Sequence, residues 1–118
     1  MNRYAAKFLF QFRVVVSGKS SKRRICEEKI ILIFAQSAEN ALKMAQKIGK
    51  KSEHNYLNDE GNLVFYEFVG VLDLMHLGIE CDKNEVWYEI KECLMPMERK
   101  ERLIPNEDQL SAIRNERR

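Results

Sequence analysis

His54 is flanked by acidic and phenolic side chains of the kinds that general acid–base catalysis employs. Glu53 and Tyr56 are its near neighbours in the chain, and Glu67 and Asp73 follow on the next apolar stretch. A general base must lie within hydrogen-bonding reach of the proton that it removes, and this spacing fixes no distances. We therefore favour a structural or surface role for His54 and keep a small acid–base enzyme as a third hypothesis.

The cysteines and the second histidine show no metal-ligand spacing. Metal ligands usually come in close pairs such as C-x₂-C, whereas Cys26, His76, Cys81 and Cys93 are scattered. Nucleophilic catalysis requires a thiol activated by a neighbouring base. Cys26 and Cys93 fall within or beside expected strands, which favours small core residues. We expect no catalytic residue, no metal and no cofactor.

A basic cluster occupies the polar loop after the first apolar stretch. Its members are Lys19, Lys22, Arg23 and Arg24. Beside aromatic side chains on a sheet, such a cluster is typical of surfaces that contact phosphates and stack bases. Acidic side chains on the same expected strands, among them Glu27 and Glu67, would repel a nucleic-acid backbone. An RNA-binding or ribosome-associated domain is therefore the alternative hypothesis, and nucleic acid is the less favoured partner.

Length and composition indicate one small domain with a low net charge. The 118 residues include 20 basic and 18 acidic side chains, a net charge of +2, which does not by itself imply nucleic-acid or membrane binding. No apolar run reaches the roughly 20 residues of a membrane helix. The N-terminus lacks the layout of a signal peptide. Three widely spaced cysteines are no disulfide framework, so we expect a reduced, cytoplasmic protein.

Two stretches near the N-terminus predict an antiparallel hairpin. Residues 3–16 alternate between apolar and polar side chains, the period of a half-buried strand. The polar loop 17–23 joins them to a second strand, residues 24–34. That second strand begins amphipathic and ends fully apolar, so we expect its last half to lie under a helix.

A helix follows directly. Ser37 is the predicted N-cap, and Glu39 lies in the first turn, where a negative charge suits the helix dipole. The apolar stripe at helical spacing consists of Ala38, Ala41, Leu42, Ala45 and Ile48. Residues 53–57 are a candidate short strand, and residues 58–62 have the asparagine, aspartate and glycine of a turn.

Residues 62–74 are the most apolar run, with apolar side chains on both faces, which is typical of a strand inside a sheet. Gly70 within it indicates a bulge or a close approach of another backbone. Residues 85–92 alternate and predict a last strand. The fold class is therefore α+β: an antiparallel sheet of four to five strands, in the order β-β-α-(β)-β-β, with one helix on one face.

One helix cannot cover four long strands. The other sheet face must be partly solvated, or covered by the tail or a partner. We expect one domain over residues 1–95 and a charged tail over residues 96–118. In the tail, Asn106 is a candidate cap for a short helix carrying Leu110 and Ile113, and a frayed tail is an equal alternative.

Residues 2–75 resemble a family of small bacterial proteins that is catalogued only as a domain of unknown function. The resemblance rests on Tyr4-Ala5-Ala6-Lys7; on Ala35, Ser37, Ala41 and Ala45; on Gly49, His54 and Tyr56; on the turn at Asn58 and Gly61; and on Glu67-Phe68-Val69-Gly70-Val71-Leu72-Asp73. The resemblance supports the fold boundaries. It implies no catalytic residues, because the family has none assigned.

The function predicted from the sequence is a non-catalytic protein-binding module. Antitoxin or immunity proteins of bacterial competition systems fit this description, because they need only a stable fold and a patch complementary to a cognate toxin domain, such as a nuclease. Such a complex buries roughly 1,200–2,000 Å². The candidate partner-binding residues are Trp87, Tyr88, Glu80, Asp82, Glu85, Glu107 and Asp108.

Overall fold

The computed structural model describes residues 1–78 and 83–118. These residues form two compact units, Met1–Tyr88 and Glu89–Arg118. The first unit contains a five-stranded sheet and one long helix, and the second contains short helices only. The predicted α+β class, with a mostly antiparallel sheet and one helix packed on one face, is confirmed.

The N-terminal hairpin is built on β1 (Asn2–Val16). Ser17 and Gly18 form a two-residue turn, and both have positive φ, 53° and 78°, which suits the twist of a tight hairpin. The return strand comes in two pieces, β2 (Lys19–Ser20) and β3 (Ile25–Ala35), both antiparallel to β1. The predicted hairpin is therefore confirmed, with the basic loop interrupting its second strand.

The second hairpin joins β4 (His54–Leu57) to β5 (Leu63–Leu77). The Asn58 side chain stabilises its turn by accepting hydrogen bonds from the backbone N–H groups of Glu60 and Asn62, at 3.0 and 2.9 Å. β5 lies between β1 and β4, but β4 pairs only with its first four residues. β1 is the central strand, since it pairs with β3 and β5 along most of its length.

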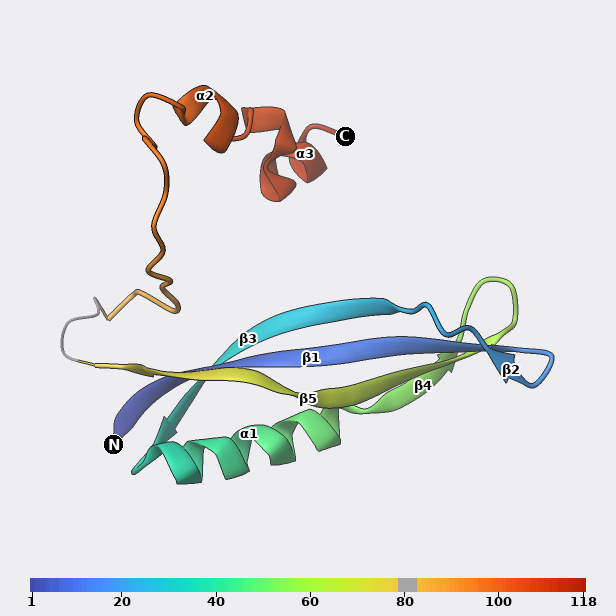
Figure 1. Ribbon diagram of the computed structural model, residues 1–118. Coiled ribbons are helices and arrows are strands. Elements are labelled where there is room, and N and C mark those ends of the chain that lie inside the picture. Colours follow the sequence, from blue (N-terminus) through green and yellow to red (C-terminus); the bar gives the residue numbers. More distant parts are fainter. Residues whose placement is uncertain (79–82) are drawn as a thin grey trace. The chain divides into compact units, whose positions relative to one another are not determined.

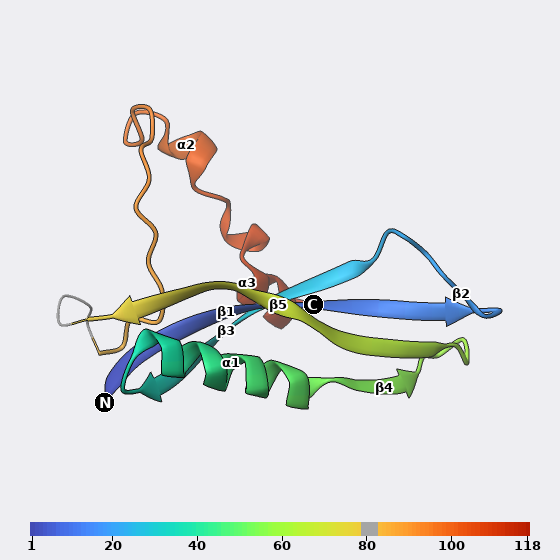
Figure 2. The same ribbon diagram turned by 60° about the horizontal axis from the view of Figure 1, so that its bottom comes forward.

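Helix α1 (Ala38–Ser52) covers one face of the sheet (Figures 1 and 2). The Ser37 side chain caps it, as predicted, by accepting a hydrogen bond from the N–H of Asn40 at 3.2 Å. Its buried side is made of small residues, Ala41, Ala45 and Gly49, which let the helix axis approach the strands closely.

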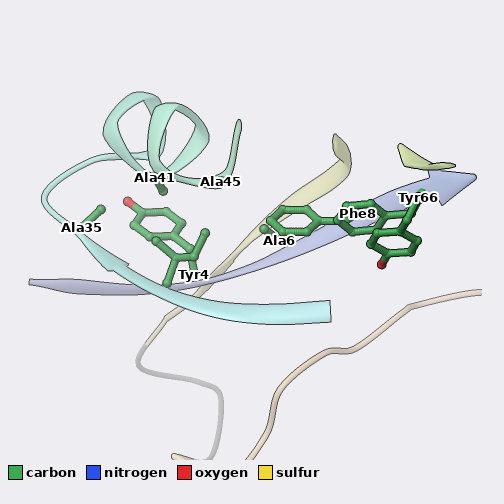
Figure 3. Close-up of a cluster of buried hydrophobic side chains, with 9 residues drawn as sticks. Tyr4, Ala6, Phe8, Ala35, Ala41, Ala45 and Tyr66 are labelled. Carbon is green, nitrogen blue, oxygen red and sulfur yellow. The ribbon is translucent and has the colours of Figure 1, made fainter. Parts of the chain in front are cut away.

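The core lies between α1 and the sheet. On β1 the even-numbered residues from Tyr4 to Phe10 lie on the face that α1 covers and are buried there, and Phe8 and Phe10 are fully buried. Figure 3 shows the Tyr4 side chain beside Ala35 and Ala41, with Phe8 and Tyr66 farther along the sheet. Alternation along β1 is thus the direct source of the core.

Two bulges interrupt the pairing of β5 with β1. The register shifts between Lys7 and Phe8 and again between Leu9 and Phe10, so Leu72 and Val69 have no partner residue on β1. Gly70, opposite Leu9, lies between these two irregularities, which confirms the bulge predicted there.

The predicted last strand over residues 85–92 is wrong, because this stretch has no regular secondary structure. Residues 83–88 lie instead against the sheet face opposite α1, hereafter the open face. The Arg3 guanidinium donates a hydrogen bond to the Lys83 carbonyl, and the Lys7 ammonium lies 5.5 Å from the centre of the Trp87 ring. An alternating pattern forms a strand only if it pairs with the edge of a sheet, and residues 85–92 pair with no strand of the described residues.

The second unit contains α2 (Lys100–Leu103), the 3₁₀ turn η1 (Glu107–Gln109) and α3 (Ser111–Glu116). Gln109 accepts a hydrogen bond from the N–H of Asn106 at 2.9 Å. The predicted tail helix is therefore a 3₁₀ turn followed by α3, and α3 carries Ile113. No helix in the described residues is long and apolar enough to cross a membrane.

Candidate docking surface

Three large apolar side chains stand in a row on the open face of β3. Ile30, Leu32 and Phe34 are 41%, 40% and 55% exposed, and we call them the β3 row. Their neighbours on the helix side, Ile33 and Ala35, are buried at 3%. The prediction that the apolar end of this strand lies under a helix is therefore confirmed for Ile33 and Ala35, and the opposite face is partly solvated, one of the alternatives expected for it. A continuous apolar run does not show which of its alternate residues remain outside.

The β3 row lies on an edge strand with a regular backbone. β3 pairs with β1 from Asn2–Ala35 to Phe12–Ile25 without a register shift. Within residues 1–78 and 83–118, no strand pairs with the other side of β3. A long, regular edge of this kind presents a row of backbone donors and acceptors to whatever approaches it.

Trp87 lies against Lys7 on the open face of β1. Lys7, whose ammonium lies over the Trp87 ring, is the cross-strand partner of Ile30 and forms an ion pair with Glu28 at 3.5 Å. Trp87 is half-buried, and its indole N–H is buried without an acceptor among the described residues. The next residue, Tyr88, is 41% exposed. Of the predicted partner-binding aromatics, Trp87 is thus an anchor and Tyr88 is accessible.

The predicted acidic contacts are distributed differently. Glu85 is half-buried on the segment that carries Trp87. Glu80 and Asp82 lie outside the described residues. Glu107 and Asp108 belong to the second unit, where both carboxylates contact the guanidinium of Arg117, Glu107 at 3.3 Å.

The predicted basic cluster forms the end of the hairpin. Lys19 is exposed in β2, and Lys22 and Arg23 are exposed in the loop. Arg24 is also exposed, and it donates to the Ser21 carbonyl at 2.9 Å and to the Gln11 amide oxygen at 3.2 Å. A hollow of about 190 Å³ lies here. Its lining residues are Phe12, Val14, Ser21, Arg23, Arg24 and Ile25.

The structure brings together only some of the candidate acid–base residues around His54. Glu53, His54 and Glu67 line a hollow of about 230 Å³, together with Asn55, Phe65 and Tyr66. The Glu53 carboxylate accepts a hydrogen bond from the N–H of Phe68 at 3.0 Å, and a His54 ring nitrogen lies 3.0 Å from the Ser52 carbonyl oxygen. Tyr56 and Asp73 do not line this hollow.

Glu67 is committed to an ion-pair network on the open face. Arg13 bonds both of its carboxylate oxygens, at 2.9 and 3.1 Å, and Gln11 donates to one of them at 3.0 Å. The hydrogen bond from Arg13, and to a smaller extent that from Gln11, lowers the pKa of Glu67. The hydrogen bond to Glu67 in turn raises the pKa of Arg13. A carboxylate held in this way is a poor general base, and the network instead ties β1 to β5.

A second network, which the sequence did not suggest, crosses the helix side of the sheet. The Tyr66 hydroxyl donates to the Glu27 carboxylate at 2.5 Å, and Lys29 lies 3.6 Å from the same carboxylate. Burial raises the pKa of Tyr66, and the Tyr66 hydrogen bond lowers that of Glu27. The pairs Phe10–Glu27 and Phe12–Tyr66 in the strand registers show how β1 brings these two distant residues together.

The two cysteines among the described residues do not occupy the core. Cys26 and Cys93 are both exposed, so their prediction as small core residues is wrong, and Cys81 lies outside the described residues. Cys26 falls on the open face of the edge strand, where alternation turns it away from the helix. Among the described residues, no three histidine, cysteine or acidic side chains form a group that could hold a metal ion.

The comparison with known families shows to which family the chain belongs. The model of a domain of unknown function, DUF4288, matches residues 3–87. The chain belongs to this family. The DUF4288 domain ends at Trp87, one residue before the end of the first unit, so it contains the sheet, α1 and the segment that rests on the open face. No curated protein and no solved structure matches the chain.

Proposed function

We propose that this DUF4288 domain is a non-catalytic protein-binding module that docks a partner protein on its open face. The observation that carries the proposal is the exposure of Ile30, Leu32 and Phe34 side by side on a regular edge strand. Exposed apolar rows of this kind mark interaction surfaces, because removing them from water is favourable once a complementary surface is available. Tyr88 adds an aromatic side chain of the type enriched at interfaces.

The partner that we propose is a cognate bacterial toxin domain, such as a nuclease, which the protein neutralises in the cytoplasm by covering part of its surface. Inhibition by occlusion requires a rigid fold and a complementary patch, and the regular β1–β3 pairing with its exposed apolar row supports this proposal. The patch is apolar and the chain is slightly basic. We therefore expect apolar contact with the toxin rather than mimicry of nucleic acid.

Affinity capture from native cells tests this proposal. The tagged full chain is used as bait, bound material is washed at high salt, and the retained proteins are identified. We expect a stoichiometric protein encoded by a neighbouring gene, which kills cells when expressed alone and is neutralised by co-expression of this chain. Apolar contacts withstand the salt wash.

Matched variants connect this result to the β3 row. Leu32→Glu removes an exposed apolar side chain from the row, whereas Val69→Glu removes one from the bulged part of β5. We expect Leu32→Glu to lose both capture and neutralisation and Val69→Glu to keep both. Equal retention by both folded variants would contradict docking through the β3 row.

RNA binding is the second candidate, because Lys22 and Arg23 are exposed beside the hollow at the hairpin end. Phosphate contacts release counterions, so this binding would weaken steeply as salt is raised. Capture of RNA or ribosomes that is lost in the salt wash, and lost in a Lys22→Glu, Arg23→Glu variant, would favour this candidate over the toxin.

A further inference from the structure

The two outer edges of the sheet are unequal. On β5, beyond the four residues that pair with β4, bulges at Val69 and Leu72 break the regular backbone, and the Glu53 carboxylate occupies the N–H of Phe68. Bulges and capped backbone groups are devices that prevent edge strands from pairing with other chains. On β3 the described residues show neither device over the eleven residues of the strand.

The composition of β3 sharpens this contrast. Charged side chains occur only in its first half, as Glu27, Glu28 and Lys29, and every residue from position 30 to position 35 is apolar. Natural edge strands usually carry a charge or a proline where pairing must be avoided. The second half of β3 carries neither, which is the arrangement expected of an edge that is paired in the functional state.

We propose that β3 pairs with β3 of a second copy of this chain, antiparallel and about a two-fold axis at Leu32. In an antiparallel pair, opposite residues lie on the same face of the sheet, so the residues paired across a dyad must have the same parity. With Leu32 opposite Leu32 of the second copy, Ile30 lies opposite Phe34 on the open face, and Ile31 lies opposite Ile33 on the helix side.

This register is favoured by charge. It brings apolar side chains against apolar side chains and leaves Glu27 and Glu28 beyond the paired segment, where they remain solvated. A register centred on Glu28 would place two carboxylates directly opposite each other, which is destabilising. Glu27 and Lys29 keep their existing contacts with Tyr66 in the Leu32 register.

The helix leaves room for this pairing. α1 makes more of its sheet contacts with β5 than with β3, and Figure 1 shows it running along β5. Pairing uses the backbone edge, so the open face is doubled rather than covered. The two β3 rows become one continuous apolar surface, which enlarges the proposed docking surface. The dimer itself requires no partner protein, so it stands or falls independently of the toxin proposal.

Sedimentation of the purified full chain tests the proposal. Over concentrations from about 1 μM to about 1 mM, we expect a monomer–dimer equilibrium. Leu32→Glu should weaken dimerisation by about tenfold or more, because it places a charge at the dyad. Val69→Glu, which introduces the same charged side chain on the bulged edge, should leave dimerisation unchanged. Circular dichroism establishes that both variants are folded.

Hydrogen exchange and cross-linking identify the edge. Alternate backbone N–H groups of β3 point away from β1, and we expect only these to gain protection as the concentration rises. In a background with all three cysteines replaced by serine, Leu32→Cys should form a disulfide-linked dimer under mild oxidation. A chain that stays monomeric, or a dimer without new protection in β3, would overturn the proposal. A β3-paired dimer without the Leu32→Cys cross-link would overturn the register.

Discussion

Gly49 of α1 lies directly against the aromatic ring of Phe68 in β5. A Cβ atom added at Gly49 would be 2.5 Å from the Phe68 Cε1 atom, far inside van der Waals contact. The Phe68 ring in turn packs against Phe8 and Phe10, with ring centres 5.7 and 5.5 Å apart. The missing side chain at Gly49 is therefore what allows the last turn of the helix to reach the aromatic core.

Gly49→Ala should lower the free energy of unfolding by about 1 kcal/mol. Overpacking typically costs about 1–3 kcal/mol, and the better helix propensity of alanine returns about 1 kcal/mol. Urea denaturation followed by circular dichroism measures the change. Gly70→Ala is the matched control, because no atom lies within 4 Å of its added Cβ, and it should not destabilise by a comparable amount.

Tyr66→Phe should destabilise the protein by about 1 kcal/mol at neutral pH, because it deletes the hydrogen bond to Glu27. That bond holds the pKa of Glu27 below its ordinary value of 4.5. A lowered folded-state pKa contributes stability above pH 4.5, and the contribution is lost as the pH falls through the folded-state value. The gap between the two proteins should therefore shrink progressively below pH 4.5.

Urea denaturation at a series of pH values measures this gap. Tyr56→Phe is the control, since Tyr56 is exposed and lies on the short strand β4. It should change stability little at any pH. A Tyr66→Phe deficit that stays constant from neutral pH down to about pH 3, well below the ordinary Glu27 value of 4.5, would show that Glu27 is not the acceptor that matters.

Trp87→Phe should leave the free energy of unfolding unchanged or slightly raised. It removes an indole N–H that is buried without an acceptor among the described residues, and it keeps an aromatic ring beneath Lys7. Trp87→Ala should cost about 2 kcal/mol, less than for a fully buried aromatic residue, because Trp87 is half-buried. Unfolding is followed by circular dichroism and not by tryptophan fluorescence, because Trp87 is the single tryptophan and both variants remove it. An equal loss in both variants would indicate that the N–H is hydrogen-bonded.

Local patterns in the sequence predicted the elements that depend on near neighbours. Alternation identified β1, the short polar loop after it identified the hairpin with β3, Ser37 identified the start of α1, and Asn58 identified the turn before β5. Each of these signals operates within about four residues, because a strand face, a helix cap and an Asx turn are local geometries. The sequence therefore determined the α+β class, the antiparallel sheet and its single covering helix.

Only the tertiary structure decided which strand is central, which apolar side chains stay outside and which polar groups meet. Arg13 with Glu67 and Tyr66 with Glu27 are pairs far apart in the chain, and the register of β1 with its two neighbours brings them together. The exposure of the β3 row depends on the fact that no strand of the described residues lies on the outer side of β3. Ile30 to Phe34 reads as core in the sequence, because exposure at an edge is set by the neighbours that the folded sheet lacks, and no local pattern records that.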